Sequence, residues 1–442
     1  MKHSARLFVA GLTCLAYSAQ AQIAFEEYDL DNGLHVILHQ DKGTPIVAVS
    51  VLYHVGSKNE ETNRTGFAHF FEHLLFEGSE NIGRGEYMKL IQANGGTLNA
   101  NTMQDRTFYY EILPSNNLEL GLWMESERML HAKVDQTGVE TQREVVKEEK
   151  RMRVDNQPYG SWSSEMFKRA FPDHPYNWAV IGSMDDLNAA QTEDYVNFYD
   201  KFYVPNNATL SIAGDLDPEE AKKWISKYFG DIPAGEVVEQ PNKNATALTS
   251  EIQDTIYDNI QIPAIFTGYR MPGQSDVDAY ALQMLTTALS DGPSSRFSKR
   301  MVDQDQSALQ VAAFPYALED HGIFITLALT NGDHTTSEVL GTMDEEIARI
   351  QNELMRPTEF EKVLNKVEAD FITQNGSVSG IAESLANYYV YFGDANLINT
   401  EIERYRAVTR EDIQRVAQTY LKPSNRVVLT YLPKPSANPS VE

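Results

Sequence analysis

The feature that most constrains this chain is the segment His-Phe-Phe-Glu-His, which runs from His69 to His73. On an α-helix, residues four positions apart lie one turn apart on the same face, so both imidazoles can reach a single ion. Imidazole nitrogens bind Zn²⁺ at about 2.0–2.1 Å. Glu72 lies between them in angle, where it can act as a general base toward water in an open coordination position. The segment therefore predicts a helix with two metal ligands and a catalytic carboxylate.

The five residues alone also fit a less specific interpretation, in which an amphipathic helix contains two structural histidines and a solvated glutamate. The surroundings favour the metal site, because the other faces of this helix are almost wholly apolar and polar side chains embedded there need partners. These apolar residues are Phe67, Phe70, Phe71, Leu74, Leu75 and Phe76. Gly66 precedes the helix and Gly78 can terminate it.

A second helix offers a third ligand. Glu149 follows His73 by 76 residues, in a segment expected to be helical from Thr137 to about Arg153. Glu148 is turned about 100° away from Glu149, toward more charged neighbours, and is assigned to solvent or a structural ion pair. A surface glutamate on a charged helix is the ordinary alternative for Glu149. The residues alone leave that alternative open, and the distance of Glu149 from the histidine pair speaks against it only through the family resemblance described next.

These residues resemble the insulinase, pitrilysin and mitochondrial processing peptidase family of zinc peptidases. That family combines the inverted H-x-x-E-H motif with a glutamate at this distance. The similarity includes residues 66–79 around the motif, residues 95–102, which look like the family's substrate-binding edge strand, and residues 292–297 in the second half. The resemblance covers nearly the whole chain after residue 22 and is to the short, two-domain subunits of the family.

The resemblance implies one Zn²⁺ per chain, bound by His69, His73 and Glu149, with Glu72 activating the zinc-bound water. It also implies a substrate-binding strand, to whose backbone an extended peptide could add. The residues of that strand are Leu98, Asn99, Ala100, Asn101 and Thr102. The chain departs from the family at Gln142, seven residues before Glu149, where many members have a glutamate. A neutral amide can hydrogen-bond around the site but cannot raise ligand basicity as a carboxylate would.

The first 21 residues are typical of a secretory signal peptide. They contain Lys2 and Arg6, an apolar run over residues 7–17, and Ala-Gln-Ala at residues 19–21. We expect an exported protein, periplasmic or secreted, with no stable membrane anchor, because the apolar run is too short to span a bilayer comfortably. Cys14, the only cysteine of the sequence, lies in this segment. Disulfides and thiol catalysis are therefore not expected in the mature chain.

The chain is strongly acidic, with 37 Lys and Arg against 63 Asp and Glu and a net charge of −26. Such an excess repels phosphate chains, so nucleic acid is not an expected partner. Acidic residues lining a substrate chamber would favour basic or neutral peptides. A soluble acidic surface without that role explains the composition equally well.

Two parts of the sequence share a similar pattern of residues at an offset of 218 residues. Asp194 leads to Pro205 and a predicted strand at 208–213, and Asp412 leads to Pro423 and a predicted strand at 427–431. The repeated pattern predicts an internal duplication of a unit of about 210 residues. The predicted organisation is a signal peptide at 1–21, a catalytic zinc-binding domain at 22–232, a linker at 233–249 rich in Gly, Pro and Asn, and a homologous domain without metal at 250–442.

Both halves alternate short strands with helices. Strands are expected at 34–38, 47–53 and 323–329, and helices at 87–93 and 337–351. The pattern predicts an α+β fold of two homologous halves, each a mostly antiparallel sheet backed by helices. The resemblance implies the same architecture, the fold of the mitochondrial processing peptidase type.

The expected function is a zinc-dependent metalloendopeptidase that hydrolyses peptides or unfolded polypeptides. The resemblance also implies a partner, because subunits of this length commonly close a substrate chamber as a homodimer or as a heterodimer with a second family subunit. A non-catalytic or partner-dependent structural or processing subunit of the same fold is the alternative. Such scaffolds typically lose one or more motif positions, and this chain has all four.

Overall fold

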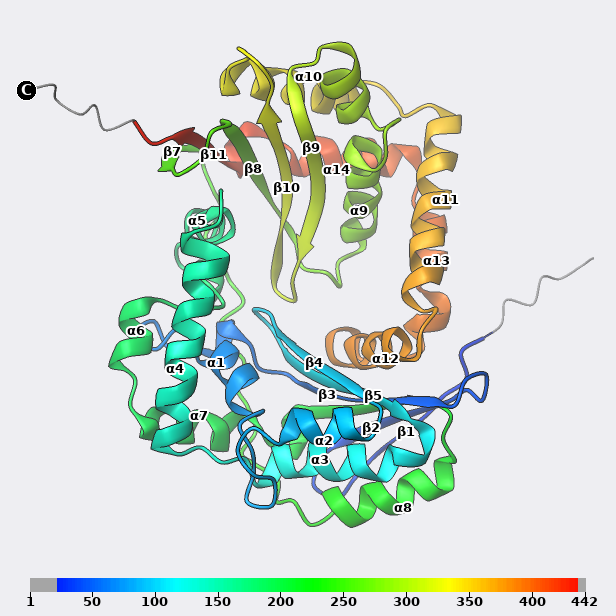
Figure 1. Ribbon diagram of the computed structural model, residues 1–442. Coiled ribbons are helices and arrows are strands. Elements are labelled where there is room, and N and C mark those ends of the chain that lie inside the picture. The colour runs from blue at the N-terminus through cyan, green and yellow to red at the C-terminus, as the bar shows by residue number, and fades with distance from the viewer. Residues whose placement is uncertain (1–21, 436–442) are drawn as a thin grey trace, which may run out of the picture.

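The computed structural model describes residues 22–435 and shows two sheets, one in each half of the chain (Figure 1). The predicted signal peptide lies outside these residues. The first sheet has the strand order β1-β2-β6-β3-β5-β4. Its strands are β1 (Glu26–Asp29), β2 (His35–Gln40), β3 (Ile46–Tyr53), β4 (Thr97–Thr102), β5 (Thr107–Pro114) and β6 (Ala208–Gly214). Only the β2–β6 pair is parallel.

The second sheet has the order β7-β11-β8-β10-β9, which is the order of the first sheet without β1. Its strands are β7 (Ile252–Asp258), β8 (Ala264–Pro272), β9 (Ala308–Ala317), β10 (His321–Thr330) and β11 (Arg426–Pro433). The β7–β11 pair is parallel, as β2–β6 is, and the others are antiparallel. The starts of β3 and β8, and of β6 and β11, are both 218 residues apart. The shared strand order and offset support the predicted duplication.

Helices cover both sheets. In the first half they are α1 (Phe67–Leu74), α2 (Tyr87–Ala93), α3 (Leu118–Leu130), α4 (Gln136–Lys150), α5 (Trp162–Ala170), α6 (Met184–Ala189), α7 (Thr192–Phe202) and α8 (Pro218–Phe229). In the second half they are α9 (Val277–Ser290), α10 (Thr336–Asn352), α11 (Pro357–Gln374), α12 (Val378–Phe392), α13 (Leu397–Ala407) and α14 (Arg410–Tyr420). None of the helices within residues 22–435 has the length and apolar character needed to cross a bilayer.

The central strands are apolar on both faces because both faces are covered. Successive side chains of a strand point to opposite faces. In β3, Val47, Val49 and Val51 belong to the core on the side of α1 and α3, whereas Ala48 belongs to a separate core that contains residues of α12. This double burial produces the nearly continuous apolar sequence Ile-Val-Ala-Val-Ser-Val-Leu-Tyr of the strand.

One helix of each half covers the sheet of the other half. Helix α12, orange in Figure 1, packs on the first sheet, where Leu385 and Ile381 meet Ile37 and Ala213. Helix α5 rises to the second sheet in the same view, and its Met166 and Phe167 join the core formed by β8, β10 and β11. The exchange joins the two halves through two apolar cores and leaves each sheet between two helical layers.

The packing of α12 on the first sheet leads to a prediction about the stability of the protein. Leu385 on α12 is 0% exposed, so Leu385→Ala should lower the free energy of unfolding by about 2–5 kcal/mol, the range for a leucine truncated in a core. Ile372→Ala on α11 is the matched control, because Ile372 is 63% exposed and its loss should change stability by less than about 0.5 kcal/mol. Urea denaturation of both variants measures the difference. Equal losses would contradict the packing of α12 on the first sheet.

The α+β class and the mostly antiparallel sheets are confirmed, and α2 has the predicted bounds. The predicted start of the ligand helix at Thr137 is wrong. Helix α4 begins at Gln136, because the Asp135 carboxylate caps it by accepting a hydrogen bond from the backbone N–H of Gly138 at 2.8 Å. Residues 233–249 contain no helix or strand. The domain boundaries around them stay a prediction.

Candidate metal centre

Helix α1 is fixed at its start by a buried carboxylate. Glu60 accepts hydrogen bonds from the backbone N–H groups of Gly66, at 2.8 Å, and Ala68, at 2.9 Å. The first N–H groups of a helix lack partners within it, and Glu60 supplies acceptors for two of them. Burial raises the pKa of this carboxyl group well above its usual value. Gly66 has φ 91°, and a Cβ at this position would lie 2.7 Å from the carbonyl oxygen of Ile181. Glycine is therefore required where the chain enters the helix.

Aromatic packing fixes the orientation of α1 about its axis. Phe67 and Phe70 stack on Tyr195 of α7, with ring centroids 4.5 and 4.3 Å apart, and Phe71 stacks on Phe198 at 5.6 Å. These three phenylalanines are buried. The remaining face of the helix, with His69, Glu72 and His73, is turned toward α4 and β4, which both contact α1.

The three predicted ligands converge. Glu149 Oε2 lies 2.9 Å from His73 Nε2 and 3.4 Å from His69 Nε2. Ligand atoms of the three side chains all lie within 4.8 Å of one another. Within residues 22–435 no other group of three or more His, Cys, Asp or Glu side chains meets this criterion. Glu148, on the neighbouring position of α4, forms an exposed ion pair with Arg151 at 2.9 Å.

The protonation of these groups suits a metal. Burial, with a smaller contribution from His73, lowers the pKa of His69 to about 4, so His69 is neutral near pH 7, the state in which imidazole binds metals. The hydrogen bond from His73 lowers the pKa of Glu149, which keeps this carboxylate charged. Burial raises the pKa of Glu72, which favours a role as proton acceptor over that of a permanent anion.

The donor set fits Zn²⁺. Two ligands of a tetrahedral zinc ion, each about 2.0–2.1 Å from it, lie roughly 3.3 Å apart. The separations of Glu149 Oε2 from the two imidazole nitrogens, 2.9 and 3.4 Å, bracket that value. Two imidazoles and one carboxylate are a usual protein set for a catalytic zinc, whose fourth position stays open.

Glu72 has a partner from a different element. Thr102, the last residue of β4, donates a hydrogen bond from its hydroxyl to Glu72 Oε2 at 2.7 Å. Thr102 was expected only as part of the substrate-binding strand. Its contact with Glu72 joins two segments 30 residues apart, and no local spacing in the sequence indicates it.

The strand predicted to bind substrate is at the edge of its sheet. β4 is the last strand in the order and pairs with β5. Its residues alternate in burial, with Ala100 buried and Asn99 exposed. A strand with one unpaired edge can accept an extended peptide through main-chain hydrogen bonds. Substrate binding by residues 98–102 stays a prediction.

Gln142 lies on α4 and donates a hydrogen bond from its amide to Glu77 Oε1. Glu77 also forms an ion pair with Arg84. Because Glu77 follows α1 closely in the chain, the amide ties α4 to the segment after the metal helix. A direct effect of Gln142 on metal binding stays a prediction.

Arg153 was not anticipated. Its Nη1 lies 2.7 Å from Glu149 Oε1, the oxygen turned away from the histidines, and its side chain is 77% exposed. It lies in a π-helical turn, Arg151–Asp155, that extends α4. The spacing of a glutamate and an arginine four positions apart on a helix is a signal that could have indicated this pair.

Comparisons with known proteins show which family this chain resembles. Residues 35–181 match the family model described as insulinase (peptidase family M16), and residues 190–367 match the one described as peptidase M16 inactive domain. The zinc protease PqqE of Helicobacter pylori is 28% identical over 421 residues, which are 93% of this chain and 94% of that protein. An uncharacterised zinc protease of Mycobacterium leprae is 27% identical over 403 residues, 89% of this chain and 88% of that protein.

Solved structures are similar over the same length. A protease from Helicobacter pylori superimposes with a TM-score of 0.88 at 27% identity, covering 93% of this chain and 100% of that one. The periplasmic protease PqqL from Escherichia coli shares the fold, with a TM-score of 0.76 at 20% identity, and the match covers 93% of this chain but 48% of PqqL. The predicted resemblance is confirmed: this chain belongs to the insulinase family of peptidases, family M16.

Proposed function

We propose that this chain is a zinc metalloendopeptidase that hydrolyses peptides or unfolded polypeptides. The observation that carries the proposal is the convergence of His69, His73 and Glu149 beside Glu72, at the end of an edge strand. The names of the relatives, zinc proteases, support the same class of enzyme.

In the proposed reaction each side chain has a separate role. His69, His73 and Glu149 would hold Zn²⁺, which supplies Lewis-acid activation of water and of the peptide carbonyl. Glu72 takes the proton of the attacking water and later delivers it to the leaving amine. Thr102 donates to Glu72 Oε2, so it orients the carboxylate and leaves Oε1 for the proton transfer.

The substrate would bind as an additional strand along β4. Main-chain pairing is tolerant of sequence and requires an extended peptide, which folded proteins rarely present. Such binding fits a hydrolase of peptides and unfolded segments. It would place the backbone of the substrate beside Thr102, and therefore beside the proton acceptor.

Location and partners are part of the proposal. Export to the periplasm or the medium is supported by the pattern of residues 1–21. A second family subunit, identical or different, would complete the substrate chamber. The match of this chain to about half of PqqL supports that arrangement, because one chain there has the length of two.

A non-catalytic scaffold is the second candidate. It is favoured by the model that matches residues 190–367, which is described as an inactive domain. Cleavage of a mixed library of quenched peptides by the purified mature chain separates the two. The enzyme predicts cleavage that a chelator stops and that Zn²⁺ restores. Zinc-loaded protein that cleaves nothing, alone or mixed with an added second family subunit, would support the scaffold.

The contact between Thr102 and Glu72 leads to a prediction. Thr102→Val should lower kcat by at least about tenfold, because a hydrogen bond to a charged group is worth about 1.5–3 kcal/mol and 1.36 kcal/mol corresponds to a factor of ten. Zinc content should not change. Thr97→Val, at the exposed start of the same strand, is the matched control and should retain the parent kcat. Equal kcat values in the two variants would exclude an orienting role for Thr102.

A further inference from the structure

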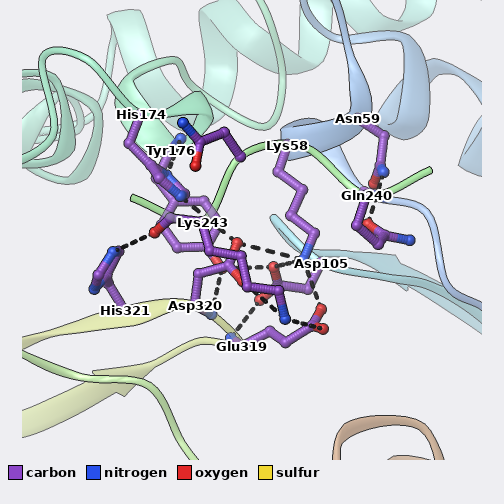
Figure 2. A network of polar contacts seen from close by, with 12 residues as sticks. Lys58, Asn59, Asp105, His174, Tyr176, Gln240, Lys243, Glu319, Asp320 and His321 are labelled. Carbon is purple, nitrogen blue, oxygen red and sulfur yellow. Dashed lines mark hydrogen bonds and ion pairs between the residues drawn. The ribbon is translucent and has the colours of Figure 1, made fainter. Parts of the chain in front are cut away.

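A buried lysine joins the two halves of the chain. The Lys58 side chain is 1% exposed, and its Nζ lies 3.0 Å from Asp105 Oδ1, 2.6 Å from Glu319 Oε2 and 3.6 Å from Asp320 Oδ2. Figure 2 shows the ammonium group reaching into this group of carboxylates. Lys58 and Asp105 belong to the first half, and Glu319 and Asp320 form the turn between β9 and β10 in the second.

Lys58 and Glu319 stay ionised despite their burial. Burial alone would lower the pKa of Lys58, but Asp105 and Glu319 raise it above its usual value. Burial alone would raise the pKa of Glu319, but the hydrogen bond from His54 and the charge of Lys58 lower it to about 2. A buried ion pair of this kind depends strongly on geometry, since each charge requires its partner.

Hydrogen bonds fix the two turns against each other. The Asp105 carboxylate accepts the backbone N–H of Glu319 at 2.9 Å and the hydroxyl of Tyr176 at 2.6 Å. The Tyr176 hydroxyl in turn accepts the backbone N–H of Asp320 at 3.1 Å. Figure 1 shows the β9–β10 turn pointing toward the turn between β4 and β5. Asp105 lies in that second turn.

The β4–β5 turn is also held from within the first half. The backbone N–H groups of Ser57 and Lys58 donate to the carbonyl oxygens of Met103, at 3.2 Å, and Gln104, at 2.9 Å. A Cβ on Gly56 would lie 2.4 Å from the Gln104 oxygen, so a side chain at that position would displace the turn.

The turn leads directly to the proton acceptor. It closes with a hydrogen bond from the Met103 N–H to the Arg106 oxygen at 2.9 Å. Thr102 immediately precedes it and donates to Glu72 Oε2 at 2.7 Å. The position of the turn therefore sets the position of the Thr102 hydroxyl.

We propose that the β9–β10 turn of the second half positions Glu72, through Asp105 and Lys58, the β4–β5 turn and Thr102. The inference rests on the proposed peptidase function and gives the second half of the chain a role in the chemistry of the first half. Asp105, Lys58 and Glu319 are positioning residues, because they act on Glu72 through Thr102.

The test uses two variants that keep the size of the side chain, Asp105→Asn and Glu319→Gln. Each should lower kcat by roughly tenfold or more, since displacing a reacting group by 1 Å can cost about 100-fold. KM should stay within about twofold, because β4 keeps its free edge, and zinc content should not change. The control is Asp278→Asn, which removes a partly buried carboxylate paired with Arg415 at 2.7 Å in the second half. Asp278→Asn should keep the parent kcat, although it should lower thermal stability about as much as Asp105→Asn and Glu319→Gln do.

A double-mutant cycle decides whether Asp105 acts through Thr102. On the Thr102→Val background, Asp105→Asn should lower kcat by less than about twofold, because the contact that it controls is already lost. If the two substitutions lowered kcat by independent factors that multiply in the double variant, the proposal would be overturned. So would parent-like kcat in both Asp105→Asn and Glu319→Gln.

A crystallographic readout separates this inference from the proposed function. In zinc-loaded Asp105→Asn the distance from the Thr102 hydroxyl to Glu72 should exceed hydrogen-bond length, whereas Asp278→Asn should retain the bond. An unchanged bond in Asp105→Asn would overturn the positioning role even if the parent enzyme is active. A zinc-loaded parent chain that cleaves no peptide, alone or mixed with an added second family subunit, would overturn the peptidase function, while the displaced hydroxyl would still show the coupling between the halves.

Discussion

Glu72→Gln is expected to abolish peptide cleavage and to leave one zinc ion per chain. The amide keeps the size of the side chain but cannot accept the proton of the attacking water. General-base catalysis contributes about 10²–10⁴ in rate, so kcat should fall at least about 100-fold. Because Glu72 is not among the three converging ligand atoms, zinc content measured by atomic emission should equal that of the parent.

Glu148→Gln is the matched control for this substitution. Glu148 lies next to a proposed ligand in sequence, but its carboxylate is exposed and paired with Arg151. Its loss should leave both kcat and zinc content unchanged. Substantial hydrolysis by Glu72→Gln would show that another group accepts the proton. Loss of zinc from Glu72→Gln would show that Glu72 is a ligand and not the base.

His73→Ala is expected to remove zinc and activity together. His73 Nε2 lies 2.9 Å from Glu149 Oε2, so the substitution takes away one of the three converging donors. Even groups that only support metal ligands change affinity about 10–100-fold, so we expect a loss of more than about 100-fold. Competition with a chromogenic chelator measures this affinity directly, independently of turnover.

His131→Ala is the matched control for the ligand variant. His131 is a partly exposed histidine that lies 3.3 Å from the exposed Glu80. The same substitution there should leave zinc affinity and kcat unchanged. If His73→Ala bound zinc as tightly as His131→Ala, the assignment of His73 as a ligand would be wrong.

Local patterns in the sequence were enough to predict the elements that carry the site. The spacing of His69 and His73 depends only on helix geometry, and the apolar faces of α1 follow from its packing on α7. Helix α4 begins at Gln136 and not at Thr137. Asp135 and Thr137 are both good capping residues, and only the fold decides which of them caps the helix.

The relation between the halves could not be predicted from the sequence. The offset of 218 residues indicated two similar units, but each unit was expected to cover its own sheet. In the structure α5 and α12 exchange sheets. An amphipathic helix shows which of its faces is buried but carries no information on which sheet buries it.

The same limit applies to the site. Pairing of Glu149 with the two histidines was suggested by family resemblance, and the spacing alone could not establish it. The contact of Thr102 with Glu72, and the cluster around Lys58, join segments 30 and 261 residues apart. Lys58, Asp105 and Glu319 would each be taken for ordinary surface residues, because charged side chains are seldom buried unless they are paired.

The most direct test is a crystal structure of Glu72→Gln with zinc and a bound peptide, with anomalous scattering recorded at the zinc edge. We expect one strong peak between His69, His73 and Glu149, and the peptide as an additional strand along β4 with a carbonyl at that peak. A zinc ion bound by a fourth protein side chain, a peak elsewhere, or a peptide bound away from β4 would contradict the proposed peptidase site.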